Sequence, residues 1–236
     1  MPIGEADRLI TVYTPYIGKL KTVARGVRKS TSKISGHLEP LTYLTIMVAK
    51  GRTLDIISQV ETLDSFPALR KDLKLISQAI YMADLIDNFA SENESNPDMF
   101  QIFLEMLGYL QIGEGEILLR FFEMKLLENQ GYLPELYSCV SCKNPLAPET
   151  NLFNHSYGGI MCRSCFKDGA SEKHPISVNS IKVLRHIHNN SYQNTRGIKL
   201  SKQLSDELSK LLSFYIRHVL ERKLKSTEFM NKVARM

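Results

Sequence analysis

The chain has 236 residues, of which 43% are hydrophobic and 23% are charged. These ordinary globular proportions exclude a largely disordered, collagen-like or low-complexity chain, and the length predicts one or two domains. No apolar run approaches the roughly 20 residues of a membrane-spanning helix, and the polar start lacks the apolar core of a signal peptide. Four cysteines are too few for a disulfide scaffold. We therefore expect a cytoplasmic protein without a membrane partner.

Charge is distributed unevenly along the chain, although 30 basic and 25 acidic residues leave a net charge of only +5. Residues 8–38 contain seven basic and no acidic residues, and residues 173–236 contain thirteen basic and four acidic residues. Between them, residues 84–128 contain ten acidic and two basic residues. A solvated face explains most single charge runs, but segregation on this scale indicates an anionic partner for the basic ends.

The first part of the chain, residues 1–64, has the pattern of a small β domain. Runs rich in β-branched and aromatic residues, separated by turn signals, predict four short strands. The expected strands cover residues 9–13, 20–24, 42–49 and 54–60. Residues 25–33 are basic and rich in serine, which predicts a mobile, cationic loop. Short strands joined by hairpins indicate a small antiparallel sheet or barrel.

After residue 64 the apolar period changes to that of helices. Ser65 is the expected N-cap of the first helix, with Pro67 in its first turn and an end near residue 89. We divide the chain into a β domain, a first helical part, a cysteine module and a second helical part, at residues 1–64, 65–136, 137–170 and 171–236. Further helices are expected at residues 98–110, 114–129, 178–188 and 202–224.

Two cysteine pairs are the strongest chemical signal. Cys139-Val-Ser-Cys142 and Cys162-Arg-Ser-Cys165 are separated by 19 residues, a spacing typical of zinc knuckles. Four thiolates around one ion leave no position for water, so the expected zinc is structural. A redox-active pair or an iron–sulfur cluster is the alternative, but the βαβ context of a thioredoxin-like site is missing. His155 and His174 are expected to be loop histidines, and Gly158 and Gly159 to give the chain freedom to turn.

No Walker A loop, GxGxxG, GxSxG or HExxH pattern occurs in the sequence. The carboxylates of Glu114, Glu116 and Glu123 are expected on solvated helix surfaces, with nothing to pair them around a reacting atom. The sequence therefore predicts a protein that is not an enzyme.

The basic β domain has the composition of a nucleic-acid-binding surface. Lys and Arg contact phosphates without regard to base sequence, and aromatic rings stack on bases. A solubilising surface is the alternative, and Tyr13 could belong to the core. Besides Tyr13 and Tyr16, the candidate DNA-binding residues are Arg8, Lys19, Lys21, Arg25, Arg28, Lys29 and Lys33.

Four segments, in this order, resemble the bacterial DNA repair family RecO. The first is Gly-Glu-Ala-Asp-Arg-Leu at residues 4–9, and the second is Ala-Arg-Gly-Val-Arg-Lys at residues 24–29, followed by Leu-Glu-Pro at residues 38–40. The third is the double cysteine motif with Phe153 and the two glycines before Cys162. The last is Arg-Lys-Leu-Lys-Ser at residues 222–226.

The resemblance implies an α+β multidomain protein in which an N-terminal OB-fold β-barrel is followed by an all-α domain with an inserted four-cysteine zinc module. It implies a mediator of homologous recombination in the RecF pathway that binds single- and double-stranded DNA and anneals complementary strands. Such proteins work with RecR, engage single-strand-binding protein and help RecA to replace it on DNA. We therefore expect a nucleoid-associated protein.

Only Met1, Pro2 and Ile3 precede the opening motif, so we expect either that the first strand of the barrel is absent or that the start codon is misplaced. Two other functions stay open at this point. A zinc-ribbon regulator of transcription or RNA would show a preference for sequence or for RNA. A metal-dependent enzyme would need an open coordination position, against which four sulfur ligands argue.

Overall fold

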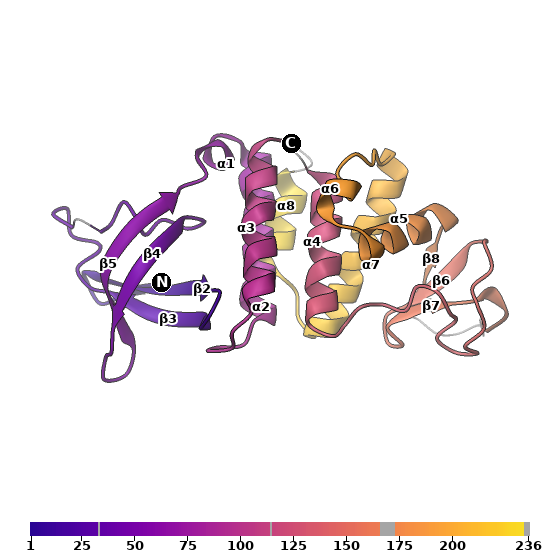
Figure 1. Ribbon diagram of the computed structural model, residues 1–236, viewed down its shortest axis with the longest axis horizontal. Coiled ribbons are helices and arrows are strands. Elements are labelled where there is room, and N and C mark those ends of the chain that lie inside the picture. The colour runs from indigo at the N-terminus through magenta and orange to yellow at the C-terminus, as the bar shows by residue number, and fades with distance from the viewer. Residues whose placement is uncertain (33, 114, 166–172, 234–236) are drawn as a thin grey trace. The chain divides into compact units, whose positions relative to one another are not determined.

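The structure is a computed structural model that describes residues 1–32, 34–113, 115–165 and 173–233 (Figure 1). Lys33 and Glu114, both named above, lie outside the described residues. The chain forms two compact units: unit 1 comprises Met1–Gly113 with Phe229–Met236, and unit 2 comprises Glu114–Glu228. Within the described residues, no helix is long and apolar enough to cross a membrane.

Unit 1 begins with a five-stranded sheet in the order β1-β2-β3-β5-β4. The β3–β5 pair is parallel and the other pairs are antiparallel. The prediction of an N-terminal, OB-like β domain is confirmed. The strands are β1 (Pro2–Ile3), β2 (Asp7–Thr14), β3 (Gly18–Ala24), β4 (Tyr43–Ala49) and β5 (Asp55–Asp64).

The sheet is not closed into the expected barrel. Strand β1 is present but short, since only Pro2 and Ile3 pair with β2. Two residues offer too few backbone groups to bridge β2 and the far edge of the sheet, and no described strand pairs with the outer edge of β4. The sheet therefore stays open between β1 and β4.

The core of the sheet includes residues from the segment between β3 and β4. Val27 and Leu38 are buried together with Ala24 of β3 and Ile57 of β5. The backbone N–H of Arg28 donates to the carbonyl of Ala6 at 3.0 Å. The first residues of the segment predicted to be a mobile loop are therefore joined to the sheet by an apolar side chain and backbone hydrogen bonds.

Three helices complete the main part of unit 1: α1 (Pro67–Lys71), α2 (Leu73–Phe89) and α3 (Pro97–Gln111). The single helix predicted after Ser65 is broken at Asp72, whose carboxylate accepts the N–H groups of Lys74 and Leu75. Phe66, with φ of 46°, takes the N-cap position of α1 that Ser65 was expected to fill. A second N-cap therefore interrupts the apolar pattern that made the helix look continuous.

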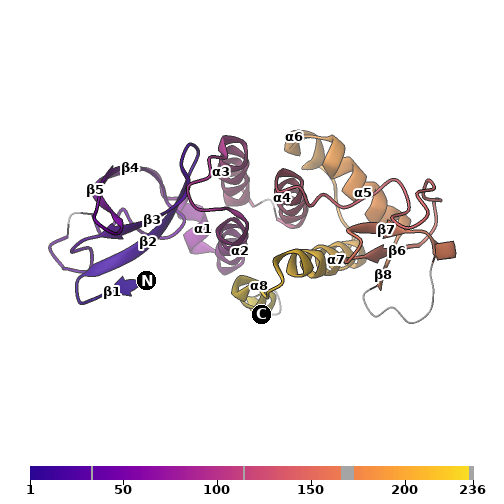
Figure 2. The same cartoon turned by 90° about the horizontal axis from the view of Figure 1, so that it is seen from below.

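Unit 2 packs its helices around α4 (Glu116–Asn129), which contacts α5 (Val178–Asn189), α6 (Tyr192–Thr195) and α7 (Lys202–Leu220) (Figures 1 and 2). The helix expected to run to residue 224 ends at Leu220, because Glu221 adopts a left-handed conformation with φ of 55°. Helix α8 (Lys225–Val233) follows.

The cysteine segment contains more regular structure than the sequence indicates. Strands β6 (Asn151–Asn154), β7 (Gly159–Met161) and β8 (Lys173–Ile176) form a sheet in the order β7-β6-β8, and a 3₁₀ turn covers Arg163–Cys165. Figure 2 shows this sheet beside α7, where the ring of Phe153 packs edge-on against Tyr215 at 5.3 Å.

One carboxylate expected on a solvated surface is buried. Glu123 of α4 is fully inaccessible and forms an ion pair with Arg120 of the same helix at 2.9 Å. Both side chains are shielded because most of α4 is buried, from Ile117 to Leu127. The expectation for Glu123 is therefore wrong, whereas Glu116 at the start of the helix is exposed as expected.

Candidate metal centre and cationic surface

The four cysteines converge at one point of unit 2. Cys139 and Cys142 lie between α4 and β6, and Cys162 and Cys165 follow β7. Their sulfur atoms all lie within 4.8 Å of one another, and the sulfurs of Cys142 and Cys162 are 3.8 Å apart. Two segments separated by 19 residues therefore supply one four-sulfur cluster.

Each CxxC pair forms a tight turn that presents backbone N–H groups to sulfur. The N–H of Lys143 donates to the carbonyl of Cys139 at 2.9 Å, and Lys143 itself has φ of 62°. The N–H groups of Ser141 and Cys162 point at the sulfur of Cys139, at 3.4 and 3.3 Å. Such donors stabilise a negatively charged sulfur.

These contacts are reflected in the acidity of the thiols. Burial raises the pKa of Cys139, but the backbone N–H groups of Cys142, Cys162 and Ser141 outweigh it and lower that pKa to about 6. The hydroxyl of Ser164 lowers the pKa of Cys162. Hydrogen bonds with Cys142 and Cys162 raise the pKa of Cys165 to about 12. These hydrogen bonds thus favour the thiolate form of Cys139, the buried member of the cluster.

The donor set fits a tetrahedral metal ion. Zinc–thiolate bonds of about 2.3 Å place neighbouring sulfurs about 3.8 Å apart, which is the distance between Cys142 and Cys162. The four cysteines could therefore hold one metal ion, with small movements of the sulfurs that lie up to 4.8 Å apart. His155 and His174 are not part of the cluster. Their rings contact each other at 4.9 Å, and His174 stacks on Phe214 of α7 at 4.8 Å.

The two glycines before Cys162 have different structural roles. Gly158 has φ of 64°, a conformation that favours glycine. Gly159 lies so close to the preceding segment that a Cβ atom there would be 2.7 Å from the carbonyl oxygen of Glu135. Strand β7 can therefore approach residue 135 only because this position carries no side chain.

A second cluster, of cations, lies at the corner of the sheet where β2 begins and β3 ends. Arg8 on β2 pairs in register with Ala24 at the end of β3, and Arg25, Arg28 and Lys29 follow as exposed side chains. We call these four residues, Arg8, Arg25, Arg28 and Lys29, the corner cations.

Two hydrogen bonds at this corner of the sheet join residues 4–9 to residues 24–29, the first two segments that resemble a known family. The N–H of Gly26 donates to the carboxylate of Asp7 at 2.8 Å. The guanidinium of Arg28 donates to the carbonyl of Gly4 at 3.3 Å. Residues 4–9 and 24–29 are thus one structural element.

Lys19 and Lys21 have a different environment from the corner cations. Lys19 lies 3.5 Å from the carboxylate of Asp87, and Lys21 forms an ion pair with Glu92 that raises the pKa of the lysine and lowers that of the carboxyl. The N–H of Asn93 donates to the carbonyl of Lys19 at 3.0 Å. Both lysines therefore attach the connection between α2 and α3 to the sheet.

The two tyrosines named with the cations also differ from each other. Tyr13 packs against Phe100 of α3 at 5.9 Å, and burial raises its pKa to about 12. Tyr16, at the tip of the β2–β3 hairpin, is 80% exposed.

Two further cations, Lys50 and Arg52, are exposed on the β4–β5 turn and were not among the candidates from the sequence. The only signal for them was their position beside Gly51 in that turn.

Two family models match the chain. The model described as Recombination protein O N terminal matches residues 1–66, and the one described as Recombination protein O C terminal matches residues 70–228. The chain belongs to the RecO family.

Similar proteins agree with the family models. The chain is 36% identical over 231 residues to the DNA repair protein RecO of Dehalococcoides mccartyi strain BAV1, covering 98% of this chain and 90% of that protein. It is 38% identical over 234 residues to the DNA repair protein RecO of Roseiflexus sp. strain RS-1, covering 99% of this chain and 82% of that protein. The resemblance to the RecO family is therefore confirmed. This chain belongs to a family that acts in DNA repair and recombination.

Proposed function

We propose that this RecO-family chain is a recombination mediator of the RecF pathway, without enzymatic activity, that binds single- and double-stranded DNA and anneals complementary strands. The observation that carries the proposal is the set of corner cations on an OB-like sheet. Among the described residues, no carboxylate forms an ion pair with Arg25, Arg28 or Lys29. Their charge is therefore available to phosphates.

Annealing requires that two strands approach with their charge screened and their bases accessible. Exposed Arg and Lys side chains neutralise phosphates, and contacts of this kind do not depend on base sequence. Two bound strands can therefore shift against each other until their bases match. Under the proposal RecR and single-strand-binding protein are partners and RecA is loaded indirectly, as in the family it resembles. The protein would act on the chromosome in the cytoplasm.

We further propose that Cys139, Cys142, Cys162 and Cys165 hold one structural zinc ion. When bound, zinc would join the two cysteine turns and leave no open position for a substrate. In that case the module shapes unit 2 and takes no part in chemistry. The absence of a nucleotide-binding motif agrees with annealing that needs no ATP.

Mixing the full chain with two complementary oligonucleotides, without ATP, is expected to accelerate duplex formation. The acceleration should fall as salt rises, because counterions compete for the phosphates. If the corner cations and their neighbours neutralise about four to six phosphates, the logarithm of the single-strand binding constant should fall with the logarithm of salt with a slope of roughly −3 to −4. Fluorescence quenching follows annealing, and anisotropy follows binding.

Two matched double variants test whether the corner cations are the DNA-binding surface. Arg25→Ala/Lys29→Ala is expected to reduce the magnitude of the slope by about 1.4, because each lost single-strand contact contributes about 0.7. Lys71→Ala/Lys74→Ala removes the same charge from exposed positions on α1 and α2 and should change the slope little. No annealing by the folded, zinc-loaded protein would contradict the proposal, and a preference for RNA or for one sequence would favour the zinc-ribbon regulator.

A further inference from the structure

A tyrosine ring is fixed at the surface of unit 2, between α5 and the first cysteine turn. Tyr137 is 44% exposed. The guanidinium of Arg185 lies over the ring, 4.8 Å from its centre, while its Nε and Nη2 donate to the carbonyl of Leu136 at 3.0 and 2.7 Å. The side-chain amide of Asn189 donates to the Tyr137 hydroxyl at 2.7 Å. One face of the ring and its hydroxyl are thus held by α5.

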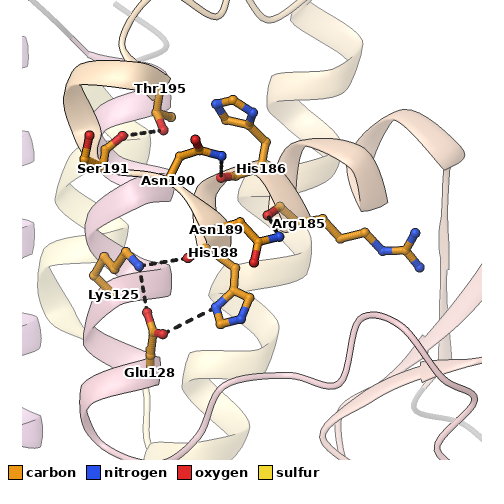
Figure 3. A network of polar contacts seen from close by, with 9 residues as sticks. All are labelled: Lys125, Glu128, Arg185, His186, His188, Asn189, Asn190, Ser191 and Thr195. Carbon is orange, nitrogen blue, oxygen red and sulfur yellow. Dashed lines mark hydrogen bonds and ion pairs between the residues drawn. The ribbon is translucent and has the colours of Figure 1, made fainter.

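Figure 3 shows where these contacts come from. Arg185, His188 and Asn189 extend from the last turns of α5, and Arg185 points away from the network that joins Lys125, Glu128 and His188. In that network, Lys125 donates to Glu128 at 2.8 Å and to the carbonyl of His188 at 3.1 Å. The end of α5 is therefore anchored on α4, and the side chains that hold the ring rest on a fixed support.

The backbone beneath the ring is fixed as well. The carboxylate of Glu135 accepts the N–H groups of Tyr137 and Ser138, at 2.7 and 3.0 Å, and these bonds lower the pKa of Glu135. The carbonyl of Tyr137 accepts the N–H of Leu146 at 3.0 Å. An exposed ring with so little freedom loses little conformational entropy when another ring stacks on it.

Besides Arg185, two lysines are exposed on the segments that flank Tyr137, which are α5 and the first cysteine turn. Lys182 is exposed one turn before Arg185 on the same helix, and Lys143 is exposed in the cysteine turn, close enough to contribute to the low pKa of Glu135. Residues 174–205 contain five Lys or Arg residues and no Asp or Glu. The carboxylate of Glu135 keeps its negative charge, because the same hydrogen bonds lower its pKa. Glu128 is paired with Lys125, and the cations Arg185, Lys182 and Lys143 outnumber Glu135.

An exposed aromatic ring flanked by cations matches the chemistry of single-stranded nucleic acid, whose phosphates need cations and whose unpaired bases stack on rings. Bases in a duplex are already stacked on one another and offer no free face. An acidic peptide would use the cations but would gain little from the ring.

We propose that Tyr137 is a stacking platform for a base of single-stranded DNA, and that Arg185, Lys182 and Lys143 hold the neighbouring phosphates. This inference rests on the proposed function, since it assumes a DNA-annealing protein. It gives unit 2 a single-strand site of its own, separate from the corner cations of unit 1. One chain would then bind two strands through two different surfaces.

The chain contains no tryptophan, so Tyr137→Trp introduces a single tryptophan at the proposed platform, whose emission can be excited separately from that of the tyrosines. Oligo(dT) is expected to quench the emission of this tryptophan, because a stacked base contacts the indole directly. An abasic strand of equal length has no base to stack and should not quench it. Tyr157→Trp is the control, since Tyr157 is 69% exposed in the turn between β6 and β7. Its emission should not respond to either strand.

Affinity gives a second, independent readout. In the Arg25→Ala/Lys29→Ala background, Tyr137→Leu is expected to weaken oligo(dT) binding about 5- to 150-fold and to leave abasic-strand binding unchanged. Tyr137→Phe keeps the ring and should retain most of the affinity. Thermal melting and zinc content verify that each variant is folded.

The outcomes separate the two proposals. If the unmodified chain does not bind oligo(dT), the proposed function fails and the platform fails with it. If the unmodified chain binds, but Tyr137→Leu binds equally well and Tyr137→Trp is not quenched, only the platform is overturned. A hexaglutamate peptide that changes the emission of Tyr137→Trp, where oligo(dT) does not, would show a peptide site and would also overturn it.

Discussion

If the four cysteines hold zinc as proposed, removing the ion is expected to unfold the cysteine segment. Structural zinc sites bind their ion with about 10 kcal/mol or more, and that free energy is available only to the folded site. Between the two cysteine turns, the buried apolar side chains are Phe153, Ile160 and Met161. Without the metal, the two turns would be joined by backbone hydrogen bonds, such as that from the N–H of Val140 to the carbonyl of Ile160 at 2.9 Å, and by these few apolar contacts.

The measurement is thermal melting by circular dichroism, with and without a strong chelator, with the metal content determined in parallel. Cys139→Ser should reproduce the effect of the chelator, because it removes the buried ligand. Ser141→Ala leaves all four sulfurs in place and should have a much smaller effect. Identical melting curves before and after complete removal of the metal would exclude a structural role for it.

Breaking the buried ion pair of α4 is expected to lower the free energy of unfolding nearly as much as truncating a large buried side chain to alanine. Glu123→Ala leaves the guanidinium of Arg120 buried without its carboxylate, and removing one partner of such a pair typically costs about 3–5 kcal/mol. The change in the free energy of unfolding can be measured by urea denaturation. Glu105→Ala removes an exposed carboxylate from α3 and should cost about 0.5 kcal/mol or less.

A double variant tests whether the cost comes from the unpaired charge. Arg120→Met/Glu123→Leu replaces both charges by apolar groups of similar size, and such exchanges are often neutral or stabilising. The double variant is therefore expected to be clearly more stable than Glu123→Ala. If the double variant were as unstable as the single one, lost packing rather than a stranded charge would be the cause.

Much of the fold could be predicted because its signals are local. The strands β2 to β5 are dense in β-branched residues such as Ile10 and Val12, and turn residues separate them. The cysteine cluster could be predicted because ligand spacing is written directly in the chain. The ordered motifs led to the family for the same reason.

The remaining features depend on contacts between distant residues. Lys19 and Lys21 looked like free cations because Asp87 and Glu92, their partners, lie about seventy positions further along the chain. Strand β7 has three residues, too few to show a period of two. The burial of Glu123 arises from the helices packed around α4. The exposure of Tyr137 is decided by the position of α5, which no pattern near residue 137 indicates.

The attachment of the α2–α3 connection to the sheet has a consequence for how unit 1 unfolds. From the sheet side, Lys19 binds Asp87 at the end of α2 and Lys21 binds Glu92 in the connection, and Tyr13 and Tyr43 both pack on Phe100 of α3. The open sheet thus gains from the helices part of the support that barrel closure would have supplied. Strands and helices of this unit should therefore melt as one cooperative block, with their slowest-exchanging amides protected to the same extent.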